Sequence, residues 1–324
     1  MLKLVRCVPA LLLCLGSPIL WGAEKVLVLG SNSSAMQEVK EAITRDLKSY
    51  QLENFIVKAD TSYEDYKGEI LKQKPRAVLL LDNKSVQLMQ QIHQDKDPFL
   101  AGLKGSATMA LNLKHILADD KLISGIAYEV PAFSILTKFR SLIDTKVSRV
   151  LVIYRKSQFQ KVFQEAQVQL EREGVQLVGL DAEKDGDTPA AIQAFIDKNL
   201  KEGQADGKVD AVLVLTDNKL LNADTFGSLW VARAQSMKIP FRCGIENFVS
   251  SKLRFCTFAA FPDHSDLAHQ VSEQITAIIE DGVSPGELGV DYLIALKMAA
   301  DKTILDRLGL KLRKANSQDL KMID

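Results

Sequence analysis

The chain has 324 residues, with 41 lysines and arginines against 41 aspartates and glutamates, and 47% of its residues are hydrophobic. This composition is typical of a folded globular protein and excludes a disordered, collagen-like or low-complexity chain. The length predicts two domains of about 150 residues, each large enough to bury its own core. Because the net charge is zero, the sequence predicts no long-range attraction to nucleic acid or to anionic lipid.

The first 23 residues have the three-part layout of a secretory signal peptide. Lys3 and Arg6 form a basic start, Cys7–Trp21 is an apolar stretch, and small residues then precede polar sequence. The apolar stretch is short for a membrane span and contains two prolines. We therefore predict a signal peptide over residues 1–23 and a mature chain that is periplasmic or extracellular, without a membrane span of its own.

The four cysteines fall into two groups. Cys7 and Cys14 lie in the predicted signal peptide, and a leucine precedes Cys14 where a lipoprotein site needs a small residue, so we expect no lipid anchor there. Cys243 and Cys256 remain in the mature chain. In an oxidising compartment they would close a disulfide worth about 3 kcal/mol, and the alternative is a pair of buried thiols. Their spacing fits neither a zinc site nor a redox Cys-x-x-Cys motif.

Short apolar strands alternate with amphipathic helices along the first half. The strands are expected over residues 25–29, 55–59, 77–81 and 125–129. Ser34 with Gln37 predicts a capping box at the start of the first helix. A second helix is expected over residues 66–74, ending before a proline.

The same alternation restarts in the second half. Strands are expected over residues 150–154, 175–180 and 211–215. Ser157 with Gln160 repeats the capping-box pattern before a long helix. This order of elements predicts an α/β protein whose parallel sheets carry helices on both faces.

The two halves also share a short sequence. Residues 78–84 read Val-Leu-Leu-Leu-Asp-Asn-Lys, and residues 212–219 read Val-Leu-Val-Leu-Thr-Asp-Asn-Lys. Each segment ends the third expected strand of its half. We interpret this as two similar βαβ lobes that face each other, with chance similarity of short apolar runs as the alternative.

Several short motifs follow one another in an order typical of one protein family. They are residues 125–131 (Gly-Ile-Ala-Tyr-Glu-Val-Pro), 148–154 (Ser-Arg-Val-Leu-Val-Ile-Tyr), 209–218 (from Val-Asp-Ala-Val to Thr-Asp-Asn), 238–241 (Lys-Ile-Pro-Phe) and 293–300 with the later Leu-Gly-Leu. In this order the chain resembles the substrate-binding proteins of ABC importers, in the branch related to tryptophan- and tyrosine-binding members. It departs from that family over residues 106–117, which lack the family's Asp-Pro-Val motif.

The resemblance implies a type I periplasmic-binding-protein fold, with two Rossmann-like lobes joined by three crossovers. It places residues 24–132 and about 262–288 in an N-terminal lobe, and residues 133–261 and about 289–324 in a C-terminal lobe. It also implies a small-molecule ligand in the cleft and a membrane permease complex as the partner.

Ligands of open parallel sheets bind beyond the carboxyl ends of the strands. The loops there offer hydroxyls and helix N-termini for a carboxylate, acidic groups for an ammonium group and tyrosines for an apolar body, which suits an amino-acid-like solute. The predicted ligand-binding residues are Ser31, Asn32, Ser33, Ser34, Asp82, Asn83, Ser85, Tyr128, Glu129, Tyr154, Ser157, Thr216, Asp217, Asn218 and Glu246. The alternative is that the serines only cap helices and the Asp-Asn pair only forms a turn.

No catalytic or cofactor motif stands out. His264 and His269 are five residues apart, which does not match the spacing of zinc-binding histidines on a helix. The sequence contains neither Gly-x-Ser-x-Gly nor a glycine-rich phosphate or dinucleotide loop. We therefore expect a binding protein and not an enzyme, with no metal and no cofactor.

Two further functions remain to be weighed for this fold. A DNA-binding regulator needs an N-terminal helix-turn-helix, and the predicted signal peptide occupies that place, so we expect no nucleic-acid partner. A ligand-sensing or scaffold module that serves a membrane partner other than a transporter remains the alternative to a transport role.

Overall fold

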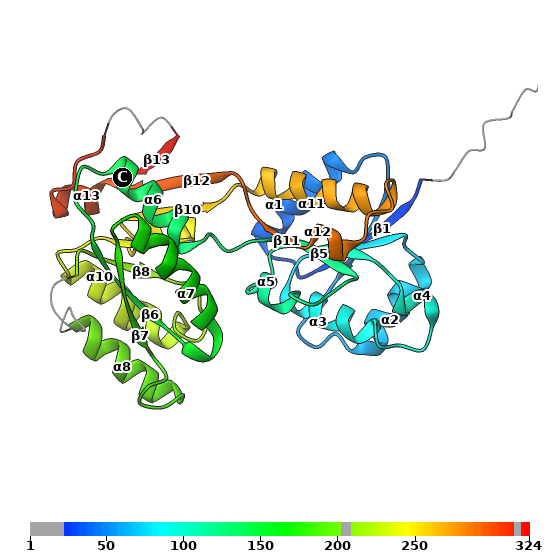
Figure 1. Ribbon diagram of the computed structural model, residues 1–324, viewed down its shortest axis with the longest axis horizontal. Coiled ribbons are helices and arrows are strands. Elements are labelled where there is room, and N and C mark those ends of the chain that lie inside the picture. Colours follow the sequence, from blue (N-terminus) through cyan, green and yellow to red (C-terminus); the bar gives the residue numbers. More distant parts are fainter. Residues whose placement is uncertain (1–22, 202–208, 314–318) are drawn as a thin grey trace, which may run out of the picture.

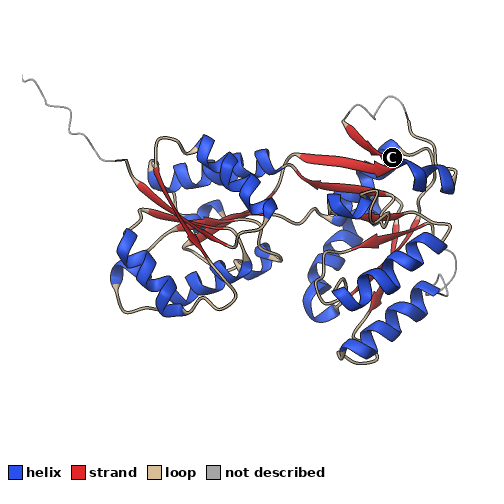
Figure 2. Ribbon diagram, turned by 180° about the vertical axis from the view of Figure 1, so that it is seen from behind, coloured by secondary structure: helices blue, strands red, loops and turns tan. Residues whose placement is uncertain are grey.

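The computed structural model describes residues 23–201, 209–313 and 319–324, so residues 1–22 of the predicted signal peptide, with Cys7 and Cys14, lie outside the described residues. Two α/β lobes lie side by side, and the sheet of each lobe has helices on both faces (Figures 1 and 2). The predicted fold class is therefore confirmed. Within the described ranges, no helix is both long enough and apolar enough to cross a bilayer.

The first lobe is built on a six-stranded parallel sheet with the strand order β11-β5-β4-β3-β1-β2. Its strands are β1 (Lys25–Gly30), β2 (Gln51–Ile56), β3 (Ala77–Leu80), β4 (Gly105–Ala107), β5 (Ile123–Ala127) and β11 (Val290–Tyr292). Its helices are α1 (Ser34–Asp46), α2 (Tyr63–Gln73), α3 (Asn83–Ile92), α4 (Pro98–Ala101), α5 (Leu113–Ile116), α11 (His264–Ile279) and α12 (Pro285–Leu288).

The second lobe has a seven-stranded sheet with the order β13-β12-β10-β9-β8-β6-β7, in which only β10 and β12 pair antiparallel. Its strands are β6 (Arg149–Tyr154), β7 (Gln176–Asp181), β8 (Ala211–Val214), β9 (Phe241–Cys243), β10 (Phe258–Pro262), β12 (Leu296–Asp301) and β13 (Leu320–Ile323). Its helices are α6 (Ala132–Leu142), α7 (Lys156–Arg172), α8 (Pro189–Lys201), α9 (Ala223–Thr225), the π-helix Phe226–Val231, α10 (Ala232–Ser236), the 3₁₀ helix Glu246–Val249 and α13 (Lys302–Leu308).

The central strands read as continuous apolar runs because helices cover both of their faces. In β1, Leu27 and Leu29 pack in the core under α2 and α3. Val26 and Val28, on the opposite face, pack in the core under α1 and α11. The repeated segments seen in the sequence end β3 and β8, which occupy equivalent places beside the first strand of each sheet.

Three crossovers connect the lobes, between β5 and α6, between β10 and α11, and between β11 and β12. The second and third are bonded to each other: the Asp263 N–H donates to the Ala295 carbonyl (3.3 Å), and the Lys297 ammonium lies 3.0 Å from the Asp263 carboxylate. Residues 290–292 pair with β5 in the first sheet. The third crossover therefore falls at residues 293–295, slightly beyond the expected change of lobe near residue 289.

Three local predictions need correction. Ser33, not Ser34, caps α1, since its hydroxyl accepts a hydrogen bond from the Met36 N–H. Helix α7 has no side-chain cap, because it begins one residue before Ser157. Strand β2 spans residues 51–56 instead of 55–59: it is an edge strand with partly exposed side chains, so its apolar run marks only its end.

A buried cation lies in the core of the second lobe. Arg242 of β9 is fully buried, and its guanidinium carbon lies 3.8 Å from the centroid of the Phe139 ring in α6. Its three guanidinium nitrogens find no hydrogen-bond acceptor among the described residues. Burial lowers the pKa of Arg242 to about 9, against the opposing attraction of Asp210. Burying a charge without hydrogen-bond partners is costly, and stacking on an aromatic ring offsets only part of that cost.

We expect that replacing Arg242 by methionine raises the free energy of unfolding by about 1–4 kcal/mol, because methionine fills similar space without a buried charge. Urea denaturation followed by circular dichroism measures the change. The exposed Arg172→Met serves as the control and should change stability by no more than about 0.5 kcal/mol. A clear loss of stability in Arg242→Met would mean that the ring contact outweighs the cost of burial.

The structure has Cys243 and Cys256 as free, buried thiols, the second of the two alternatives that the sequence left open. We expect both to resist alkylation in the native protein and to react after unfolding in urea, as read by mass spectrometry of their peptides. A disulfide between them would instead leave both unlabelled in urea until a reductant is added.

Candidate functional site

The predicted residues of the first lobe gather at the carboxyl ends of β1 and β3, as expected, but their hydrogen bonds stay within the lobe. The Ser31 N–H donates to Asp82 (2.7 Å). Asp82 and Ser85 form a capping box that begins α3. The Asn83 side chain binds both the carbonyl and the N–H of Leu111. This end of the lobe is therefore held rigidly by its own polar groups.

The remaining serine-rich loop is open to solvent. Asn32 accepts a hydrogen bond from the Gln37 side chain, Ser33 caps α1, and Ser34 is exposed at the start of that helix. None of these three side chains lines the interlobe cavity described below.

Tyr128 and Glu129 begin the first crossover. The Tyr128 hydroxyl shares a hydrogen bond with His264 (3.3 Å), whose other ring nitrogen lies 2.7 Å from Glu38. Tyr128 thereby links the first crossover to the start of α11. Glu129 is largely buried and accepts a hydrogen bond from the Asn112 N–H.

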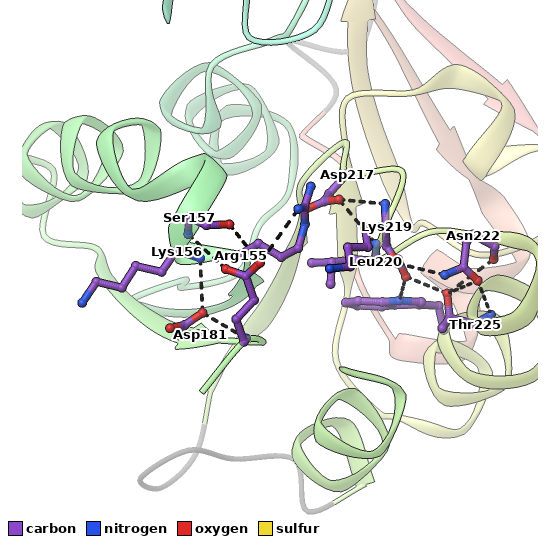
Figure 3. Close-up of polar contacts among 11 residues, drawn as sticks. Arg155, Lys156, Ser157, Asp181, Asp217, Lys219, Leu220, Asn222 and Thr225 are labelled. Carbon is purple, nitrogen blue, oxygen red and sulfur yellow. Dashed lines mark hydrogen bonds and ion pairs between the residues drawn. The ribbon is translucent and has the colours of Figure 1, made fainter. Parts of the chain in front are cut away.

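In the second lobe, Asp217 already has a cationic partner. The Arg155 Nε lies 2.8 Å from the Asp217 carboxylate, whose side chain is fully buried (Figure 3). Asp217 also accepts a hydrogen bond from the Lys219 N–H (2.9 Å). An ammonium group of a ligand would have to compete with Arg155 for this carboxylate.

The other predicted residues of this lobe are dispersed. Tyr154 stacks on Phe163, with ring centroids 4.6 Å apart, and Ser157 donates to Glu183. Asn218 is exposed, and Glu246 pairs with a lysine of β13. Thr216 is half-buried and lines the cavity described next.

A cavity of about 310 Å³ lies between the lobes, beside the first and third crossovers. Both lobes form its wall: α5 and the end of β11 belong to the first, and α6, α7 and the ends of β8 and β9 belong to the second. The residues that line it include Asn112, Leu113, Lys114, Glu129, Val130, Phe133, Ile135, Phe159, Val162, Glu165, Gln169, Leu215, Thr216, Gly244, Tyr292 and Leu293. Of the predicted ligand-binding residues, the structure brings only Glu129 and Thr216 to this cavity.

The cavity combines apolar walls with two carboxylates. Burial raises the pKa of the Glu129 carboxyl, although the Asn112 N–H opposes the shift. Burial, followed by the nearby Glu165 and Glu129 carboxylates, raises the pKa of the Tyr292 phenol. The Lys114 ammonium lies 4.4 Å from the centroid of the Tyr292 ring. The site thus offers the largely buried Glu129 carboxylate inside, with the exposed Glu165 carboxylate and the Lys114 ammonium at its edge.

Glu165, Tyr292 and Phe159 were not predicted from the sequence. Phe159 and Glu165 lie on α7, where a glutamate one residue from an apolar stripe looks like an ordinary solvent-facing residue. Tyr292 is the last residue of the three-residue strand β11. This strand joins the first sheet beside β5, which lies more than a hundred residues earlier in the chain. The sequence indicated the region around Tyr292 only through the third crossover between the lobes, which the resemblance to substrate-binding proteins implied.

Comparisons with known proteins bear on the fold. No family model matches the sequence, and no curated protein does. Solved structures that are similar to this chain include an ABC domain in complex with L-Trp from Streptococcus pneumonia (16% identity, TM-score 0.62, covering 93% of this chain and 100% of that one). Another is the ligand-free, open structure of a substrate-binding protein with adhesive properties from Clostridium difficile (15% identity, TM-score 0.67, covering 93% and 99%).

The chain has the type I periplasmic-binding-protein fold. The fold is also shared with a LacI-family repressor from Corynebacterium glutamicum (10% identity, TM-score 0.51, covering 85% of this chain and 96% of that one). At these identities the likeness concerns the architecture. The interlobe cavity of this chain is therefore interpreted from its own residues.

We expect the buried Glu129 to make stability depend on pH. Its folded-state pKa is raised, so its contribution is fully present below the unfolded-state pKa and is lost as pH rises through the folded-state pKa. Glu129→Gln cannot titrate and should gain stability relative to the wild type between about pH 4 and pH 7. Thermal melting of both proteins across that range tests this, and a constant difference would show that the carboxyl is not perturbed.

Proposed function

We propose that this chain is an exported solute-binding protein that holds a ligand with an apolar body and an ammonium group in the interlobe cavity. The observation that carries the proposal is a cavity whose wall comes from both lobes and contains Glu129 as a largely buried carboxylate. A buried carboxylate without a cationic partner is stabilised by a ligand that brings one.

The lining supports an amino-acid-like ligand. Phe133, Phe159 and Val162 provide apolar and aromatic contact for a side chain. Glu129 and Glu165 suit an ammonium group, and Lys114 at the edge suits a carboxylate. A volume of about 310 Å³ is within the range of small-ligand sites. The same fold holds L-Trp in the streptococcal structure, which makes an aromatic amino acid the first candidate.

The two-lobed arrangement supports binding by hinge closure. A ligand that touches both lobes has more contacts when the lobes close, so it shifts the population toward the closed form. The predicted signal peptide supports export, and the fold supports presentation of the closed form to a membrane permease. Binding without chemistry is part of this proposal.

Thermal melting of the purified protein against L-tryptophan, tryptamine and indole-3-propionate tests the ligand class. We expect the two amines to raise the melting temperature and the purely anionic compound to have no effect. A ligand at a hundred times its Kd adds about 2.7 kcal/mol to stability. Equal stabilisation by indole-3-propionate would contradict the ammonium assignment, and a flat response would favour a scaffold role.

The Glu129→Gln variant places the ammonium site. It should weaken binding of the amine about 10- to 100-fold, because a hydrogen bond to a charged group is lost. Glu173→Gln makes the same chemical change at an exposed residue that follows α7 and does not line the cavity. This variant should leave Kd unchanged. Titration calorimetry measures both, and equal affinities for the two variants would place the ligand elsewhere.

A further inference from the structure

A second hollow lies in the first lobe, at the end that points away from the second lobe. It has a volume of about 570 Å³. It lies where the N-terminal ends of β1, β3 and β4 meet α4 and the last turn of α11. In Figure 1, α4 and the start of β1 mark this end of the lobe. The hollow is thus separate from the interlobe cavity and shares no lining residue with it.

Four of the five charged residues that line the hollow are cations. They are Lys25, Lys74, Arg76 and Lys104, and Glu24 is the exception. In the described part of the chain, none of the four cations takes part in an ion pair. Lys25 donates to the Gln73 side chain (3.1 Å), and Lys74 and Arg76 are exposed.

Two acidic side chains on neighbouring elements have other partners. Glu69 pairs with Lys72, and Glu280 accepts a hydrogen bond from the Tyr50 hydroxyl. The four cations are thus opposed by Glu24 in the lining and by the exposed Asp281 next to Gly282, so the hollow keeps an excess of positive charge although the chain as a whole has no net charge. Such a concave cationic surface attracts phosphate groups at short range.

We propose that this cationic hollow docks on the surface of an anionic phospholipid bilayer. The first two described residues, Ala23 and Glu24, lie on its rim. Directly before them, the sequence contains the apolar stretch Cys7–Trp21. Two residues span less than about 8 Å, so while the predicted signal peptide is still attached and its apolar stretch occupies a membrane, the hollow is held close to the headgroups.

The lining fits a bilayer better than it fits a lone anion. Phe99 is 38% exposed next to the cations, and an apolar ring beside lysine and arginine side chains can insert at the boundary between headgroups and acyl chains. Lysine and arginine clusters beside a membrane-inserted segment bind anionic leaflets through several weak, additive attractions. The docking also orients the lobe, since it leaves the interlobe cavity at the opposite end free to bind solute.

Co-sedimentation of the full chain with vesicles tests the proposal. One set is phosphatidylcholine alone, and the other contains added phosphatidylglycerol. Insertion of the apolar stretch is common to both sets, so the difference between them reports the hollow together with Lys3 and Arg6, and the charge-reversal variants below separate the two contributions. We expect at least about tenfold tighter association with the anionic vesicles, and we expect this excess to fall steeply as salt is added.

The double variant Lys74→Glu, Arg76→Glu should remove most of that excess. Lys138→Glu, Lys198→Glu makes the same net change at exposed positions of the second lobe and should retain it. Circular dichroism and thermal melting verify that both variants are folded. Equal losses in the two variants, or no preference for anionic vesicles, would overturn the proposal.

Inorganic phosphate provides the last arm of the experiment. If phosphate raises the melting temperature of the wild type but not of Lys74→Glu, Arg76→Glu, while anionic vesicles show no preference, the hollow is a site for a small free anion and the bilayer assignment is wrong. Competition of phosphate with vesicle binding only at high concentration would support the bilayer assignment.

Discussion

The architecture depends on covering both faces of the first parallel sheet, and one of the covering helices, α11, follows most of the second lobe in the chain. Val26 and Val28 of β1 would face water without α11, whose Leu267, Val271 and Ile275 pack in the same core. Gln274 fixes the position of α11, since its carbonyl accepts hydrogen bonds from Ser106 (2.6 Å) and Ser124 (2.8 Å) of the sheet. In Figure 1, α11 lies beside α1 over that sheet. The chain must therefore finish most of the second lobe before the first lobe is complete, and it must cross between the lobes again to do so.

This requirement also places the candidate site. Because β11 joins the first sheet and β12 joins the second, the third crossover is short, and it runs beside the second crossover through the Asp263–Ala295 and Asp263–Lys297 contacts. The first crossover, which begins with Tyr128 and Glu129, lies against the cavity together with Tyr292. The residues that connect the lobes are thus the residues that would sense a ligand. Under the proposed function, a solute held there would touch the crossovers directly, which would couple binding to closure of the lobes through a few side chains.

The strands, their parallel order and the two-lobed class could be predicted because apolar runs of fixed length alternate with helical periodicity. The site could be predicted only in part. Glu129 and Thr216, which follow the carboxyl ends of β5 and β8, line the cavity, and whether a ligand binds there stays a prediction. Asp82 and Asp217 could not be judged from the sequence, because their role depends on partners distant in the chain, such as Ser31 and Arg155. Tyr292 and Glu165 meet only because a three-residue strand returns to the first sheet, and no local pattern encodes that return.

The zero net charge of the chain is the sum of regions that carry charges of opposite sign. The interlobe cavity contains two carboxylates, the far end of the first lobe carries four cations without ion-pair partners among the described residues, and the core of the second lobe buries Arg242 against Phe139. Charge summed over the sequence bears on long-range attraction, but it says nothing about surfaces that act within a Debye length of about 10 Å. The interlobe cavity and the cationic hollow share no lining residue and lie at opposite ends of the first lobe. The two proposals are therefore compatible, since a solute in the cavity would leave the hollow free to contact a surface.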